Sequence, residues 1–335
     1  MNTHGAEART AILKVLIEIR EPAGATRIGV ELGRAGINLS PRTVRFHLRQ
    51  LDEQGLTELI SPRAGRVISE AGREELAHAN IVERVGFIDA RVDELAYQMD
   101  FSFEKSAGTI IMNTAVILKR ELSRSLAQME PVFEKDLGMG GLLALAYPGE
   151  TLGRLTIPPD CIGIATVCSV TINGILVRHG IPVVSRYGGL LEIRNFKPVR
   201  FVELIEYKGT TLDPLEAFIA ARMTKVREAA RTGEGIIGAS FREVPANARA
   251  AVKKLHTRMQ AASLGGIFAI GEPHRPLCGI PVPDGRTGVI TTAGLNPVAA
   301  LQESGARIPL RSLASLEDYA RFKPWRDVCR QYRRG

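Results

Sequence analysis

Apolar residues recur at helical spacing in three stretches near the start of the chain. A first helix is predicted over about residues 8–20, a second ends at Gly36, and a third runs from its cap at Ser40 to Gly55. Pro41 follows that cap, at a position where a missing N–H costs no helical hydrogen bond. The apolar positions that define the first helix are Ile12, Val15, Leu16 and Ile19.

Two short runs of β-prone residues, LTELIS and RVIS, follow the third predicted helix. They are joined by PRAG, which is typical of a hairpin turn. Three helices followed by a hairpin is the order of a winged helix-turn-helix, in which the third helix enters the major groove of DNA. The sequence therefore predicts a DNA-binding domain over residues 1–78, with double-stranded operator DNA as its partner.

The predicted third helix has an apolar face and a basic face. Val44, Leu48 and Leu51 are spaced to face the core, and Phe46 is expected to pack beneath the wing rather than to meet a thymine methyl. Arginines on the basic face can reach guanine edges or phosphates. A solvated basic face on a protein–protein module is the alternative. The candidate DNA-binding residues, the last two of them at the hairpin tip, are Ser40, Arg42, Thr43, Arg45, Arg49, Arg63 and Arg66.

A heptad-like apolar seam follows the winged helix, in a helical connector expected over residues 79–105. Its residues are spaced 4, 3, 4, 3 and 4 apart, which is typical of a short coiled coil. A homodimer formed there would let two winged helices read a two-fold symmetric operator. A single helix packed on its own domain fits the same pattern. The seam residues are Ile81, Val85, Ile88, Val92 and Leu95, followed by Met99.

Residues 106–335 are expected to form an internally duplicated domain of the α+β or α/β class. Residues 140–183 align without gaps on residues 265–308 at a constant offset of 125, with ten identical pairs in 44 positions. Each copy reads helix, strand, loop, strand, polar turn, helix, strand. The two repeats are therefore placed at about 108–205 and 235–322.

The run TVCSVTING, residues 166–174, stands where a buried strand is expected to end and a helix to begin. Free N–H groups and the helix dipole at such a junction hold anions, including carboxylates. The short polar side chains either cap the helix or bind a ligand. For the cluster as a whole we expect a ligand, with Arg186 as its charged partner. The predicted effector-binding residues, drawn from both repeats, are Thr166, Cys168, Ser169, Thr171, Asn173, Ser185, Arg186, Tyr187, Thr291 and Thr292.

Composition and motifs narrow the class of protein. The chain is 45% hydrophobic and 24% charged, as in ordinary globular proteins, and its formal charge is +8. From Arg321 onward six basic residues face one acidic residue, so much of that charge lies in the tail. The four cysteines form no CxxC pair, the six histidines do not cluster, and no nucleotide-binding or hydrolase motif occurs. We therefore expect a cytoplasmic protein without metal, cofactor, membrane span or catalytic activity.

The winged helix, the connector and the run GIATVCSVTINGILVRHGIPVVSRYGGLLEI together resemble the NrpR family of global nitrogen regulators. The N-terminal part is also similar to the winged-helix domain found at the front of some ribonucleases, and the likeness covers nearly the whole chain. The resemblance implies a homodimeric transcriptional repressor of nitrogen-assimilation genes. It also implies that 2-oxoglutarate binds the regulatory domain and weakens operator binding.

Other functions stay open on the residues alone. One is a winged-helix repressor of other genes that responds to a different small anionic metabolite or amino acid, because a helix N-terminus does not specify its anion. Another is a repressor that docks a protein partner through the tail KPWRDVCRQYRRG. An enzyme with an accessory winged helix is the least favoured, because no spacing pairs acidic residues for acid–base chemistry.

Overall fold

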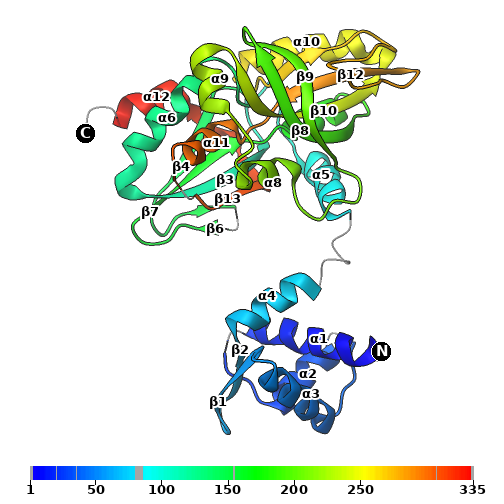
Figure 1. Ribbon diagram of the computed structural model, residues 1–335, viewed down its shortest axis with the longest axis vertical. Helices are drawn as coiled ribbons and strands as arrows, with labels where there is room; N and C mark the ends of the chain where they lie inside the picture. Colours follow the sequence, from blue (N-terminus) through cyan, green and yellow to red (C-terminus); the bar gives the residue numbers. More distant parts are fainter. Residues whose placement is uncertain are drawn as a thin grey trace. The chain divides into compact units, whose positions relative to one another are not determined.

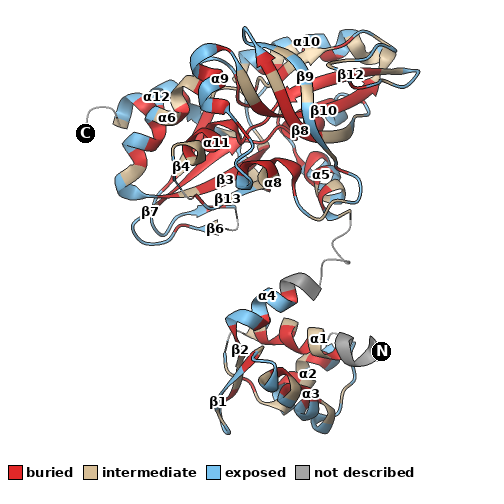
Figure 2. Cartoon of the chain, viewed as in Figure 1, coloured by how far each residue is buried: buried red, intermediate tan, exposed pale blue. Residues whose placement is uncertain are grey.

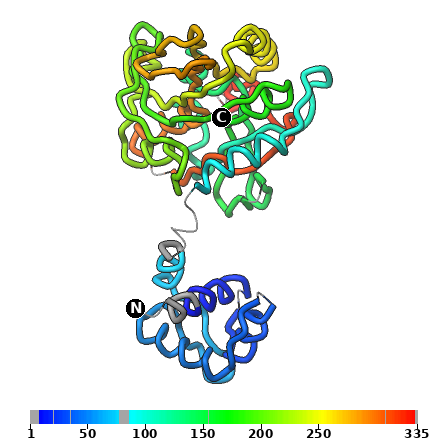
Figure 3. Tube along the Cα trace, turned by 90° about the vertical axis from the view of Figure 1, so that its right-hand side faces the viewer, coloured from blue at the N-terminus to red at the C-terminus, as the bar shows by residue number. Residues whose placement is uncertain are grey.

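The chain divides into two compact units, Met1–Val85 and Gly86–Gly335 (Figures 1 and 3). The computed structural model describes residues 3–19, 21–34, 36–79, 86–153, 155–306 and 308–332. None of the helices in these ranges combines the length and the apolar character that a membrane span needs.

The first unit has the order of elements predicted for a winged helix. Three helices enclose an apolar core that includes Ile12, Ile28, Leu32 and Leu48, and a β-hairpin follows the third helix. Ser40 caps that helix, since its Oγ accepts a hydrogen bond from the Thr43 N–H at 3.1 Å. The elements are α1 (Thr3–Ile19), α2 (Ala25–Arg34), α3 (Pro41–Glu53), β1 (Thr57–Ser61), β2 (Gly65–Ile68) and α4 (Glu70–Ala79).

The second unit contains two five-stranded sheets in which every pairing between described strands is antiparallel, so its class is α+β. The first sheet has the order β13 (Leu310–Asp318), β3 (Thr109–Leu118), β7 (Cys161–Val167), β4 (Leu142–Ala146) and β14 (Lys323–Pro324). The second has the order β11 (Ile267–Ile270), β12 (Arg286–Thr292), β10 (Gly235–Pro245), β8 (Val184–Arg194) and β9 (Lys197–Glu206). A small hairpin, β5 (Thr151–Leu152) with β6 (Leu155–Thr156), lies between β4 and β7 in the chain.

The internal repeat predicted from the sequence is present in the order of these elements. The series β3, α6, β4, β7, α7, β8 is followed by the matching series β10, α10, β11, β12, α11, β13. β7 begins at Cys161 and β12 at Arg286, and α7 begins at Thr171 and α11 at Asn296, so both offsets are 125. The helices named here are α6 (Leu122–Glu134), α7 (Thr171–Arg178), α10 (Arg249–Ala261) and α11 (Asn296–Glu303).

The two repeats exchange their last strands. The first sheet holds β3, β4 and β7 of the first repeat together with β13 of the second, and the second sheet holds β10, β11 and β12 together with β8 of the first. β3 and β10 occupy the same place, because each pairs with the penultimate strand of its own repeat and with the last strand of the other. Each repeat therefore completes the sheet of its neighbour.

Two apolar clusters cover these sheets, and the strands β3, β7, β10 and β12 are buried along most of their length, whereas the edge strand β9 is largely exposed (Figure 2). One cluster takes residues from α5, α7 and α10, and the other from α6, α11 and the remaining helices. These further helices are α5 (Phe87–Gln98), α8 (Pro214–Ala220), α9 (Val226–Thr232) and α12 (Trp325–Tyr332).

The predicted dimer seam is wrong for the three of its residues that the structure describes. Ile88, Val92 and Leu95 lie on α5 and are only 8%, 1% and 1% exposed, because they pack into the core of their own unit. α5 begins at Phe87, after Gly86 with φ of +76°, so residues 86–105 belong to the second unit rather than to a separate connector. The other two seam residues, Ile81 and Val85, lie outside the described residues.

The strand exchange predicts that neither repeat folds alone. The second unit alone, residues 86–335, cut at Gly209 in the loop between β9 and α8, yields two fragments that each lack one strand beside β3 or β10. We expect each fragment alone to show no cooperative thermal transition by circular dichroism, and an equimolar mixture to recover one. A cooperative transition in either fragment by itself would contradict the exchange as a folding requirement.

Candidate functional site

A fully buried arginine lies at the centre of the second unit. Arg242, on β10, is 0% exposed, and its Nε donates to Asn173 Oδ1 at 2.7 Å. Its Nη2 donates to Ser169 Oγ at 3.1 Å, and its Nη1 donates to the hydroxyl of Thr291. All three partners are neutral, and within the described ranges no carboxylate forms an ion pair with this guanidinium. Burial lowers the pKa of Arg242, as expected for a cation held away from water without a counter-ion.

The partners of Arg242 come from both repeats. Ser169 and Asn173 belong to the junction at which β7 ends and α7 begins, and Thr291 belongs to β12 of the second repeat. Asn173 also donates from Nδ2 to Ser185 Oγ at 2.9 Å, just after the start of β8. Four of the ten predicted effector residues are therefore brought together, around a cation that the sequence analysis did not select.

The capping interpretation of the TVCSVTING run is wrong. The cap residue of α7 is Val170, and no side chain accepts a capping hydrogen bond there. Thr171 instead holds β3, because its Oγ1 donates to the Ile111 carbonyl at 3.1 Å and accepts from the Ile111 N–H at 3.2 Å. The polar residues of this junction therefore make tertiary contacts rather than capping the start of α7.

The glycine that ends this run makes room for α5. A Cβ on Gly174 would lie 2.7 Å from both the Sδ and the Cε of Met99, the fully buried residue that follows α5. Arg178, at the other end of α7, donates from Nη1 to the Met99 carbonyl at 3.3 Å. The helix that carries Asn173 is therefore packed directly on the first helix of the second unit.

The matching junction of the second repeat is filled by the protein itself. Asn296, which corresponds to Thr171, is fully buried; its Oδ1 accepts from the Gly238 N–H, and its Nδ2 donates to the carbonyls of Leu137 and Gly238 at 2.7 and 2.9 Å. Gly294 stands where the first repeat has Ser169, and a Cβ there would lie 1.8 Å from the Val167 carbonyl oxygen. The polar groups of this junction therefore hold the backbone, whereas those of the first repeat hold a buried cation.

Two other predicted effector residues, Thr166 and Thr292, hold neighbouring groups rather than Arg242. Thr166 Oγ1 accepts from Asn113 Nδ2 at 3.3 Å, and Thr292 Oγ1 donates to the Gly138 carbonyl at 2.7 Å. Cys168 is buried beside the cluster, and burial raises the pKa of its thiol to about 11, so it remains protonated at neutral pH.

Arg186 and Tyr187 do not belong to the site. The Nε of Arg186 lies 3.5 Å from Glu243 and its Nη1 lies 3.8 Å from Glu206, so two acidic residues already balance this charge. Tyr187 is paired with Phe241, the neighbour of Arg242 on β10, and successive residues of a strand face opposite sides of the sheet. The charged residue of the cluster is therefore Arg242 rather than the predicted Arg186.

The sequence run GASFREVP, residues 238–245, contains a feature that could have pointed to Arg242. The residues on both faces of β10 are buried, from Ile237 to Val244. An arginine inside a strand that is apolar or small on both sides is forced into the interior, where a charge needs a partner. Recognising this required the knowledge that β10 is a central strand, which the sequence pattern alone did not provide.

A second buried ionisable group, Asp213, lies in the same unit. Its Oδ1 accepts from the N–H groups of Leu215 and Glu216 at 2.9 and 3.1 Å and so caps α8. Burial, aided by the nearby Glu216 carboxylate, raises the pKa of Asp213 from 3.8 to about 6. Tyr207, whose pKa burial also raises, makes a 3.3 Å hydroxyl contact with Ser240, two residues before Arg242.

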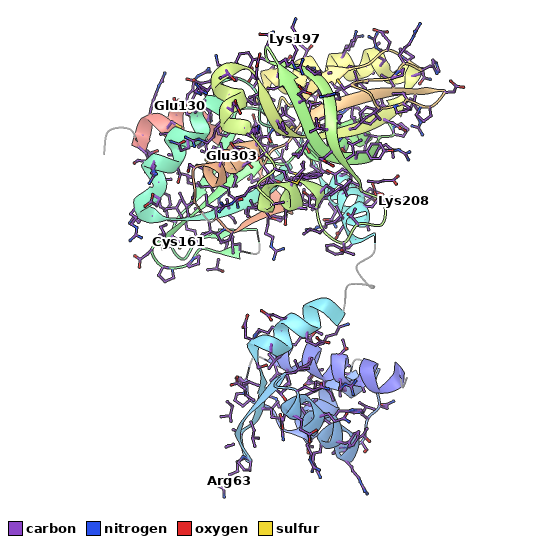
Figure 4. All side chains as sticks on the ribbon, viewed as in Figure 1. Arg63, Glu130, Cys161, Lys197, Lys208 and Glu303 are labelled. Atoms are coloured by element: carbon purple, nitrogen blue, oxygen red, sulfur yellow. The ribbon has the colours of Figure 1, made fainter. Side chains whose placement is uncertain are left out.

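The basic face of the winged helix is exposed. Arg42, Arg45 and Arg49 project from α3, and none of them is in an ion pair with a described residue, while Val44 and Leu48 are fully buried as predicted. Arg63 extends from the turn between β1 and β2 (Figure 4).

Two predictions about this surface are wrong. Arg66 lies on β2 rather than at the hairpin tip, and its Nε contacts the Asp52 carboxylate at 2.7 and 3.0 Å, which ties the wing to α3. Phe46 was expected to pack beneath the wing, but it is 58% exposed and stands among the arginines.

The fold and these surfaces define a transcriptional regulator of the winged-helix class, with a duplicated α+β domain as its second unit. The chain belongs to the NrpR family, because residues 85–324 match the family described as NrpR regulatory domains NRD1 and 2. Residues 10–76 match the ribonuclease R winged-helix domain. The resemblance noted in the sequence is thereby confirmed.

Similar proteins extend over most of the chain. It is 34% identical over 312 residues to the global nitrogen regulator NrpRI of Methanosarcina mazei, covering 93% of this chain and 96% of that one. It is 31% identical over 313 residues to the global nitrogen regulator NrpR of Methanococcus maripaludis, of which it spans only about half, 53%. A crystal structure of a nitrogen repressor-like protein from Methanococcus jannaschii superposes with a TM-score of 0.60 at 29% identity, covering 70% of this chain and 97% of that one. These relatives are regulators, in agreement with the expectation that the chain is not an enzyme.

Replacing Asp213 by Asn is expected to change how stability depends on pH. The folded protein binds the Asp213 proton more tightly than the unfolded chain does, so the wild type loses stability as pH rises from about 4 to about 6. Asn keeps the cap and does not titrate. Asp213→Asn should therefore exceed the wild type by about 2–3 kcal/mol near neutral pH and match it in acid. Urea unfolding across this range is the measurement, and a difference independent of pH would contradict the assignment.

Proposed function

We propose that this chain represses nitrogen-assimilation genes by binding operator DNA through its winged helix, and that 2-oxoglutarate bound at Arg242 weakens this binding. The observation that carries the effector part is a fully buried guanidinium whose hydrogen-bond partners are all neutral. The relatives named as global nitrogen regulators support the regulatory part.

A carboxylate is the ligand chemistry that this cluster favours. Removing a guanidinium from water costs several kcal/mol unless an anion or a set of strong acceptors replaces the water. The Arg242 side chain points at the start of α7, where the helix dipole is positive. An anion bound beside Ser169 would therefore be attracted by both the guanidinium and the start of α7. Arginine binds carboxylates through two parallel hydrogen bonds, which suits an oxo acid.

The effector signal is proposed to travel through α7 to α5. A carboxylate that takes the place of Ser169 and Asn173 on Arg242 changes the contacts that position the start of α7. α7 packs on Met99 at Gly174, and α5 is the first helix of the second unit, next along the chain to the winged helix. A coupling of about 1–3 kcal/mol, as in other allosteric proteins, would change DNA affinity by about 5–150-fold.

The active form is proposed to be a homodimer, because two winged helices can read two half-sites of a symmetric operator. The buried Ile88, Val92 and Leu95 are not available as its interface, so another surface must supply the contact. Light scattering coupled to gel filtration determines the oligomeric state directly.

A different small anion is the second candidate effector. The contacts of Arg242 specify a negative group of carboxylate size but not the remainder of the molecule. The binding experiment therefore includes succinate and glutamate, which share the carboxylate and lack the keto group.

Fluorescence anisotropy of the full chain on its own upstream DNA tests the proposal. We expect binding in the absence of effector and a loss of affinity of about 5–150-fold with 2-oxoglutarate. Succinate and glutamate are compared at equal ionic strength, because added salt alone weakens phosphate contacts. Equal effects of all three acids would contradict 2-oxoglutarate as the effector, and no DNA binding at all would contradict the repressor function.

Replacing Arg242 by Met is expected to abolish the effector response without unfolding the protein. The variant loses the cation and leaves three polar groups without a partner, but it also removes an uncompensated buried charge. These effects oppose one another, so stability should change by less than about 2 kcal/mol.

The matched control is Arg200→Met, which removes an exposed arginine of β9 that pairs with Glu192. This control should keep the 2-oxoglutarate response in the anisotropy assay. If Arg242→Met binds DNA and still responds to 2-oxoglutarate, the ligand lies elsewhere.

A further inference from the structure

Phe46 is an exposed aromatic residue in the middle of the recognition helix. Its side chain is 58% exposed, whereas Val44 and Leu48 on either side of it are fully buried. Residues three and four apart share one face of a helix, so Arg42 and Arg49 flank Phe46 on the outer face of α3. Leaving the Phe46 ring in water is unfavourable, and single exposed aromatic residues are common. The position of Phe46 between the arginines of the recognition helix indicates a role in binding.

The ring has a defined orientation before any partner binds. Phe46 meets the ring of His47 edge to face, with 5.4 Å between the ring centroids and an interplanar angle of 67°. His47 is itself buried, at 8% exposure, and therefore provides a fixed support. A pre-oriented apolar group loses little conformational entropy on contact.

The chemistry of the major groove offers one partner for such a ring. The acceptor groups of base edges, such as guanine O6 and N7, accept hydrogen bonds from arginine side chains like those on the same helix face as Phe46, and the phosphates pair with the same cations. The C5 methyl of thymine is the apolar group that a recognition helix meets on a base edge, and phenylalanine makes this contact by packing alone.

We propose that Phe46 selects a thymine in each half-site by packing on its C5 methyl. This inference rests on the proposed binding of operator DNA by α3, and it adds a base preference to that function. Arg42, Arg45 and Arg49 would then supply most of the affinity and its salt dependence, while Phe46 supplies discrimination.

The test removes the methyl group from the DNA and the ring from the protein separately and together. Sites are first selected from random duplex DNA with the full chain, and each thymine is then replaced by deoxyuridine, which keeps every hydrogen-bonding group. We expect one position per half-site at which the wild type loses about fourfold in affinity, the effect of one buried methyl group. Phe46→Ala should lose about as much on the unmodified site and be insensitive to deoxyuridine at that position.

Two further variants make the result specific. Phe46→Leu retains an apolar contact and should keep part of the deoxyuridine penalty. Val30→Ala removes an apolar residue of similar exposure, 53%, from α2 and should keep all of it. The salt dependence of binding should be unchanged in Phe46→Ala and shallower in Arg45→Ala.

The outcomes separate this inference from the proposed function. A wild type that binds its selected site but shows no deoxyuridine penalty overturns the role of Phe46 alone, as does a penalty that persists undiminished in Phe46→Ala. If the wild type selects no DNA, the proposed repressor function fails, and the role of Phe46 fails with it.

Discussion

The exchange of last strands between the two repeats is the constraint on which the second unit depends. β3 and β10 each lie between a strand of their own repeat and a strand of the other, so neither sheet is complete without both halves of the chain. This interlocking fixes where α7 and α11 must lie, because each connects a strand of one sheet to a strand of the other. The polar junctions that precede these helices are thereby brought into the interior, where every hydrogen-bonding group requires a partner.

The two repeats are arranged symmetrically, but only the second carries a charged residue at this position of its central strand. Ala115 pairs with Ile164 in the first sheet as Arg242 pairs with Val289 in the second, and 289 is 125 residues after 164. The first repeat thus has alanine where the second has its buried arginine, and that arginine reaches across to Ser169 and Asn173 of the first. Under the proposed function, a ligand that competes for Arg242 would alter contacts that join the two repeats.

The sequence predicted much of the fold, and less of the site. Helical and two-residue periodicities located the winged helix and the duplicated elements, because they reflect burial on one face and are local in the chain. The heptad spacing of Ile88, Val92 and Leu95 was equally clear, but a seam that packs on its own domain has the same spacing as one that packs on a partner. Ser169 and Asn173 of the site were identified from their place at the start of α7, whereas Arg242 lies 69 residues after Asn173 and joins them only through the sheet pairing. The side-chain direction of Phe46 likewise depends on the tertiary position of the wing.

The filled junction of the second repeat has a consequence for the shape of a dose–response curve. Asn296 uses its amide on Gly238 and Leu137, so an anion that binds at Arg242 finds a single site of this kind between the two repeats. Saturation of one chain is then hyperbolic, with a Hill coefficient of one. Under the proposed function, any steeper response would have to arise from coupling between chains, and the sharpness of the response would then depend on their assembly rather than on one domain.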